Sequence, residues 1–122
     1  MSMELPAGVT IERVSGGITA PEGFRGSGVA CGIKKTGALD LALVVSDNLA
    51  TAAGVFTTNK TCAAPVIVCR EHLQRSGGRA AAIVVNSGCA NACTGPEGMA
   101  VARSTADFLA SSLGCRPEDV LV

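Results

Sequence analysis

The feature that most constrains this fold is an apolar run at residues 80–85, AAAIVV, which leads directly into the polar sequence NSGCANACTG at residues 86–95. An unbroken apolar run bounded by polar residues predicts a central strand that is covered on both faces. The polar residues form a loop that precedes a helix. Small side chains in such a loop let a ligand approach the backbone, so this region is a candidate binding site of an α/β protein.

The segment after this loop predicts the strongest helix of the chain. Its apolar residues recur at spacings of three and four, which places them in one stripe. Thr94 and Glu97 fit a capping box, in which hydroxyl and carboxylate satisfy free amides at the helix start. Pro96 fits the first turn and Gly114 fits the position after the last turn. The stripe consists of Met99, Ala102, Ala106, Leu109 and Leu113.

The first half of the chain predicts strands separated by turn signals. Residues 1–25 are rich in Gly and Pro and are expected to form an irregular lead-in. A short strand is expected at residues 26–33. Further strands are expected at residues 40–46 and 51–58, joined by a short polar turn into an antiparallel hairpin.

The segments that flank the apolar run complete the expected α/β pattern. Residues 64–69 predict a strand, which Pro65 places at a sheet edge or at a strand start. Residues 70–75 predict a short helix that stops at a Ser-Gly-Gly sequence. The apolar end of the chain, residues 118–122, resembles a strand, and a chain end inside a strand leads us to expect a fragment.

Composition narrows the class of protein. The 122 residues suit one domain, and 48% are hydrophobic while only 16% are charged. The chain has no Trp or Tyr, so its core must be built from Ala, Val, Ile and Leu, which suits packed α/β layers. A net charge of zero with few aromatic residues argues against nucleic-acid binding. No membrane span or signal peptide is recognisable, so we expect a cytoplasmic protein.

The cysteines and the single histidine offer little catalytic chemistry. Without an export signal, the six cysteines are expected to be free thiols, with Cys31, Cys62 and Cys69 acting as small buried apolar residues. Cys89 and Cys93 have a spacing seen in zinc sites, but no second pair of ligands accompanies them, so no metal is expected. These cysteines and Cys115 complete the set of six.

Other polar residues have ordinary structural interpretations. His72 follows a glutamate on the short helix and is expected to be solvated. Lys34, Lys35 and Asp40 are interpreted as turn and strand-edge charges. Cys89 lies near a helix N-terminus, a setting that can lower the pKa of a thiol, but no base accompanies it as a catalytic nucleophile would need.

The loop residues have two interpretations, a turn and a ligand pocket. Asn and Ser can close turns by bonding their own backbone, which is the simpler interpretation. The alternative is that Asn86, Ser87, Gly88 and Asn91 shape a substrate pocket.

Four segments in order resemble the ornithine acetyltransferase family, also called glutamate N-acetyltransferase, of arginine biosynthesis. The segments are ITAPEGFRGSGVACGIKKTGALDLALVVSD from Ile18, AAGVFTTN from Ala52, AAPV from Ala63, and VVNSGCANACTG from Val84. Together the resemblance covers about residues 16–122. Cys89 stands where the family commonly has Asn, and Cys31 where it usually has a small residue such as Ala.

The resemblance implies a DmpA/ArgJ-like layered α/β fold, present here as an incomplete, single partial domain over residues 1–122. This segment would be the N-terminal part of the α chain. The family moves an acetyl group from N-acetylornithine to glutamate, and some members also accept acetyl-CoA. Its precursor cleaves itself before a threonine, which becomes the nucleophile of the β chain. A Thr-Gly pair in a segment resembling STGVIG provides the oxyanion hole.

Neither catalytic segment occurs in these 122 residues, so the resemblance assigns no catalytic residue to this chain. It implies no cofactor, with acetyl-CoA as a substrate of some members. The implied partners are the rest of the α chain and the β chain, in an α/β hetero-oligomer. Two other functions stay open: a fragment of a related self-processing aminopeptidase of the same fold, or a non-enzymatic thiol or metal module.

Overall fold

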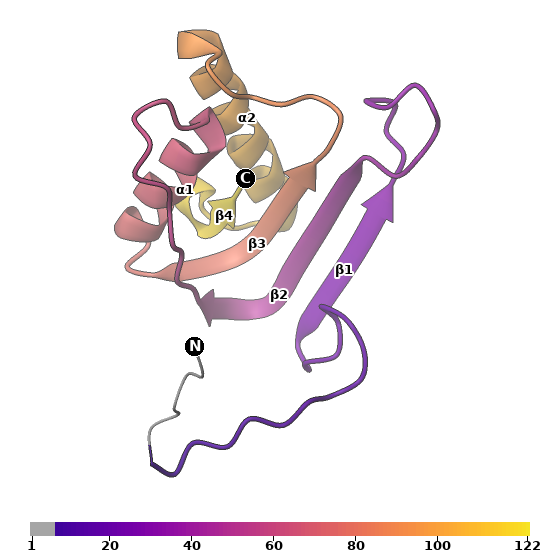
Figure 1. Cartoon of the computed structure of the whole chain (residues 1–122), viewed down its shortest axis with the longest axis vertical. Coiled ribbons are helices and arrows are strands. Elements are labelled where there is room, and N and C mark those ends of the chain that lie inside the picture. Colours follow the sequence, from indigo (N-terminus) through magenta and orange to yellow (C-terminus); the bar gives the residue numbers. More distant parts are fainter. Residues whose placement is uncertain (1–6) are drawn as a thin grey trace.

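The computed structural model describes residues 7–122 as a four-stranded sheet with two helices on one face (Figure 1). The strand order is β1-β2-β3-β4; the first three strands are antiparallel, and β4 is parallel to β3. Helices and sheet thus give the expected α/β class. The elements are β1 (Phe24–Val29), β2 (Leu41–Thr51), α1 (Ala64–Arg75), β3 (Arg79–Asn86), α2 (Gly95–Leu113), the 3-10 turn η1 (Pro117–Asp119) and β4 (Val120–Leu121).

The hairpin predicted from strands at residues 40–46 and 51–58 is wrong, because a single long strand, β2, occupies Leu41–Thr51. The strand continues through the polar Asp47-Asn48 pair to Thr51, with a register shift between Val45 and Ala50. An irregularity of this kind absorbs extra residues without ending a strand. β2 pairs with β1 on one side and β3 on the other, and residues 52–58 have no regular structure.

Strand β3 is the predicted central strand, but only one of its faces is covered. Ala80, Ala82 and Val84 are buried, whereas Ile83 and Val85 are 43% and 54% exposed. Successive side chains of a strand point to opposite faces. The predicted coverage of both faces is therefore wrong for the described residues, because both helices lie on the face of Val84.

Helix α1 begins at Ala64, so the strand predicted at residues 64–69 is wrong, while the helix predicted at 70–75 is its second half. Pro65 lies in the first turn, where a missing N–H costs no hydrogen bond. Val68 is fully buried against α2. The short apolar run favoured a strand only because periodicity cannot separate a short strand from a buried helix segment.

Helix α2 confirms the prediction in position and in its ends, with Pro96 in the first turn and Gly114 left-handed at φ 71°. Its buried stripe is built from alanines 102, 106 and 110 and is rotated from the predicted one, leaving Leu113 38% exposed. The capping box is wrong, because no side chain caps the helix. The Thr94 hydroxyl instead donates to Asn91 in the preceding loop.

The ends of the described chain agree in part with expectation. Of the irregular lead-in predicted at residues 1–25, residues 7–23 have no helix or strand, residues 24–25 begin β1, and residues 1–6 lie outside the described residues. The first strand ends at Val29, so residues 30–33 of the predicted strand belong to the loop before β2. Of the strand expected at residues 118–122, only Val120 and Leu121 are extended in the sheet. The core joins β3, β4 and α2 through Val84, Ala106, Ala110 and Val120.

Candidate functional site: a pocket beside the β3–α2 loop

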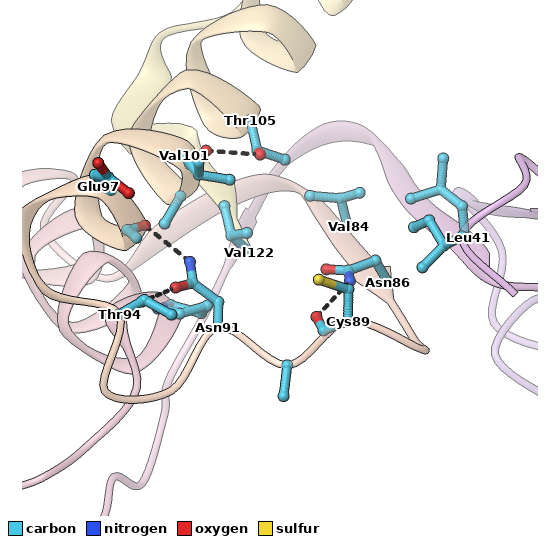
Figure 2. A pocket seen from close by; sticks show the side chains of 15 residues that line it. Leu41, Val84, Asn86, Cys89, Asn91, Thr94, Glu97, Val101, Thr105 and Val122 are labelled. Carbon is cyan, nitrogen blue, oxygen red and sulfur yellow. Dashed lines mark hydrogen bonds between the residues drawn. The ribbon is translucent and has the colours of Figure 1, made fainter.

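A pocket of about 740 Å³ lies between the end of β3, the loop of residues 87–94 and the first turns of α2 (Figure 2). Its walls are mainly apolar and include Leu41, Val84, Val101 and Val122. Polar groups gather along the loop and the helix start. They are Asn86, Asn91, Thr94 and Glu97. An apolar cavity with a few polar groups is the usual form of a small-molecule site.

Asn91 holds the loop to both helices. Its side-chain amide donates to the carbonyl of Gly98 at 2.8 Å, and its side-chain oxygen accepts from the Thr94 hydroxyl. Its backbone carbonyl accepts from the amide of Ala64, at the start of α1. Gly98 makes this approach feasible, because a β-carbon there would lie 1.7 Å from the Thr94 hydroxyl oxygen.

The other predicted pocket residues take different positions. The Asn86 side chain lines the pocket and donates to the carbonyl of Cys89 at 3.2 Å. Ser87 and Gly88 belong to the loop but are not among the residues that line the pocket. The structure thus brings Asn86 and Asn91 together at one cavity, and the substrate role of all four residues stays a prediction.

Asp40 is buried, so its interpretation as an ordinary strand-edge charge is wrong. The residue is 3% exposed, and its carboxylate accepts from the amides of Cys31 at 2.7 Å and Lys34 at 2.8 Å. These two hydrogen bonds, that of Cys31 first, lower the pKa of Asp40 to about 2. A hydrogen bond with Asp40 in turn raises the pKa of the Cys31 thiol. The available signal was its position between two leucines.

His72 is also buried rather than solvated as predicted. It is 4% exposed, and its Nδ1 lies 2.7 Å from the carbonyl oxygen of Val120. Because a carbonyl only accepts, Nδ1 carries the hydrogen. Ala64, Val68 and His72 are spaced by four residues, and this shared helical face was the signal in the sequence. His72 supports β4 and does not line the pocket.

The thiols are free throughout the described residues, and their exposure differs from expectation. Cys31 is exposed, so the prediction that it is buried is wrong, while Cys62 and Cys69 are half-buried. Burial raises the pKa of Cys69. Cys89 is exposed and lines the pocket, and Cys93, four residues further along the chain, is also exposed.

Within residues 7–122, no three residues of His, Cys, Asp or Glu come together as a metal site would require. None of the described helices combines the length and apolar character needed to cross a bilayer.

A mixed sheet backed by two helices, with a polar loop between its central strand and a helix start, defines an α/β domain with a ligand-sized pocket. Comparison with known proteins gives the family. The model of the ArgJ family matches residues 25–122. The chain belongs to the ArgJ family.

Relatives named arginine biosynthesis bifunctional protein ArgJ are similar over most of this chain. That of Thermosynechococcus vestitus is 53% identical over 111 residues, which is 91% of this chain and 26% of the relative. That of Mycobacterium tuberculosis is 51% identical over 108 residues, covering 88% of this chain and 26% of the relative. The chain therefore spans about a quarter of the length of these relatives.

Two solved structures share the fold. The ornithine acetyltransferase of Mycobacterium tuberculosis, crystallised with ornithine, matches with a TM-score of 0.81 and 48% identity, over 87% of this chain and 57% of that one. The ArgJ protein of Bacillus halodurans matches with a TM-score of 0.83 and 36% identity, over 88% of this chain and 55% of that one.

Proposed function

We propose that this chain is the N-terminal portion of an enzyme that transfers an acetyl group from N-acetylornithine to glutamate. The observation that carries the proposal is the match, over 87% of the chain, to an ornithine acetyltransferase crystallised with its ligand ornithine. The names of the relatives, which refer to arginine biosynthesis, support this proposal. The proposal locates the enzyme in the cytoplasm, with its small amino-acid substrates.

The catalytic groups are proposed to lie outside these residues. Acyl transfer through a covalent intermediate needs an activated nucleophile, a base and donors for the developing oxyanion. The pocket offers amide and hydroxyl groups at Asn86, Asn91 and Thr94, most of which already bond the chain itself. The described residues would thus supply walls and shape for the reaction.

The parallel arrangement of β3 and β4 supports the proposal that the loop of residues 87–94 lies next to the acetyl-transfer site. Chain segments that follow parallel strands emerge at the same sheet edge. Residues 87–94 follow β3, and Val122, just after β4, lines the same pocket. The resemblance implies a Thr-Gly segment after Val122 in the complete protein, so that segment would lie next to the loop. Asn86 and Asn91 would then shape the acetyl-transfer pocket.

The remaining polypeptide is the proposed partner of the uncovered apolar surfaces. Phe108 and Val101 on α2 are 77% and 61% exposed and border an apolar groove of about 560 Å³ that also includes Leu43. Ile83 and Val85 are exposed on the opposite face of the sheet. Apolar patches of this kind mark surfaces that another part of a protein covers. We propose the rest of the α chain and the β chain as that cover.

The test is to express the complete reading frame and measure acetyl transfer from N-acetylornithine to glutamate. A parallel assay with acetyl-CoA as the acetyl donor would show whether the enzyme also acetylates glutamate from that second donor. The 122-residue chain alone should be inactive and should bind an apolar dye. Peptide hydrolysis without acetyl transfer would favour the aminopeptidase, and robust transfer by the 122 residues alone would refute the placement of the catalytic groups.

A further inference from the structure

The β1–β2 loop and the β3–α2 loop lie at the same end of the sheet (Figure 1). Asp40 forms hydrogen bonds with both loops. Its carboxylate accepts one hydrogen bond at each oxygen, from the amides of Cys31 and Lys34 in the β1–β2 loop. Its backbone amide donates to Val29 at 3.0 Å, and its backbone carbonyl accepts from Ser87 of the β3–α2 loop at 2.8 Å. One buried residue therefore bonds the end of β1, the turn that follows and the loop of the pocket.

The turn that Asp40 holds carries one wall of the pocket. Ile33 lines the pocket although it belongs to the β1–β2 loop. It packs against Gly88, where a β-carbon would lie 3.2 Å from the Ile33 methyl group and 2.9 Å from Lys34 Cγ. The two loops therefore touch closely only because position 88 has no side chain.

The charge of Asp40 is satisfied by the backbone. The ammonium of Lys34 is bonded to the carbonyl of Leu39 at 3.1 Å, so the amides hold the carboxylate. Hydrogen bonds to an ionised acceptor are roughly twice as strong as neutral ones. An asparagine at position 40 would keep one oxygen as an acceptor, but its side-chain NH2 group would face the second backbone N–H. Two donors cannot form a hydrogen bond with each other. The arrangement thus needs a carboxylate.

We propose that Asp40 is a positioning residue that fixes the β1–β2 loop against the β3–α2 loop and so sets the Ile33 wall of the substrate pocket. The inference rests on the proposed function, because the pocket is taken as part of the acetyl-transfer site. Asp40 does not line the pocket, so it acts through Ile33 and the loop.

The experiment compares Asp40→Asn with Asp107→Asn in the complete gene product. Asp107 is exposed on α2, so the control removes the same charge without touching either loop. We expect hydrogen exchange of peptides covering residues 30–39 to quicken about tenfold in Asp40→Asn, because the amides of Cys31 and Lys34 lose their charged acceptor. The KM for an amino-acid substrate should rise about tenfold while kcat changes less than about twofold, as loss of uniform binding predicts.

A second variant reaches the same wall by another route. Gly88→Ala would push Ile33 away while leaving the Asp40 carboxylate bonds in place, so it should reproduce the KM change. Gly23→Ala is its control, because Gly23 also has a left-handed φ, of 82°, but a β-carbon there would meet nothing within 4 Å. If Asp40→Asn does not fold, the KM values of Gly88→Ala and Gly23→Ala still test whether the contact between the two loops sets the pocket wall.

The outcomes separate this inference from the proposed function. Unchanged exchange in the β1–β2 loop of Asp40→Asn, or equal KM values in Gly88→Ala and Gly23→Ala, would overturn the positioning role. A fall in kcat with unchanged KM would also overturn it, because that pattern indicates a group acting in the transition state. If the wild-type protein transfers no acetyl group, the proposed function fails, and the exchange result still tests whether the Asp40 carboxylate holds the β1–β2 loop.

Discussion

Replacing Gly98 by alanine should destabilise the protein, although the same change in an exposed helix stabilises it. Glycine costs about 1 kcal/mol relative to alanine in a helix interior. Here the added β-carbon would lie 1.7 Å from the Thr94 hydroxyl oxygen, 2.2 Å from the Asn91 side-chain oxygen and 2.6 Å from Thr94 Cβ. The loop must move, and the overpacking should cost about 1–3 kcal/mol.

A hydrogen bond is lost as well. The Asn91 amide donates to the Gly98 carbonyl at 2.8 Å, and a typical bond of this kind contributes about 0.5–1.5 kcal/mol. After the helical gain is subtracted, Gly98→Ala should lower the free energy of unfolding by about 1–3 kcal/mol. Urea unfolding measures this as a fall of about 1 M in the midpoint at constant slope.

Two further variants isolate the cause. Ser111→Ala, at an exposed position of α2, should change stability by less than about 0.5 kcal/mol, since it alters helix propensity alone. Combining Gly98→Ala with Thr94→Gly removes two of the three close atoms, so the glycine substitution should cost less in that background. A stabilisation of about 1 kcal/mol by Gly98→Ala alone would refute the reasoning.

Three other predictions concern the contacts of two buried polar residues and one partly exposed ion pair. His72→Phe keeps a ring but leaves the Val120 carbonyl unpaired, so the free energy of unfolding should fall by about 1–3 kcal/mol in urea titration; an unchanged value would contradict the bond. Because folding lowers the pKa of Asp40, its stabilisation should persist above the ordinary pKa of 3.8 and disappear as pH falls through about 2; acid unfolding should lack this component in Asp40→Asn. Arg103→Ala breaks a partly exposed ion pair with Glu71, and thermal melts should show a loss below about 1 kcal/mol.

Secondary structure could be predicted from the sequence where a residue pattern was compatible with only one type of element. The run at residues 80–85 predicts a strand correctly, although only one face of β3 is covered, and the proline and glycine at the ends of α2 set the limits of that helix. Residues 64–69 were ambiguous, because their six-residue apolar stretch suits a strand as well as a helix face. β2 was misjudged since an Asp-Asn pair that usually marks a turn sits here within an irregular strand.

The polar part of the site was harder to predict. Asn86 and Asn91 stood out as loop residues, but their hydrogen bonds depend on how the loop returns to α2. The sequence predicts Asp40 and His72 as surface residues because their partners are backbone groups, nine and six residues from Asp40 and 48 residues from His72. Backbone partners carry no side-chain signature, so the sequence offers only indirect signals: the leucines on either side of Asp40, and the helical face that His72 shares with Ala64 and Val68.

The side chains of α1 that hold β4 also determine how this sheet can be extended. His72 bonds the carbonyl of Val120, while the Cys69 thiol donates to the carbonyl of Val122 and accepts from its amide. A new strand beside β4 would compete for these backbone groups and would have to displace both side chains. β1 pairs only with β2 among the described strands. Strand addition, whether in correct assembly or in aggregation through an open edge, should therefore begin at β1.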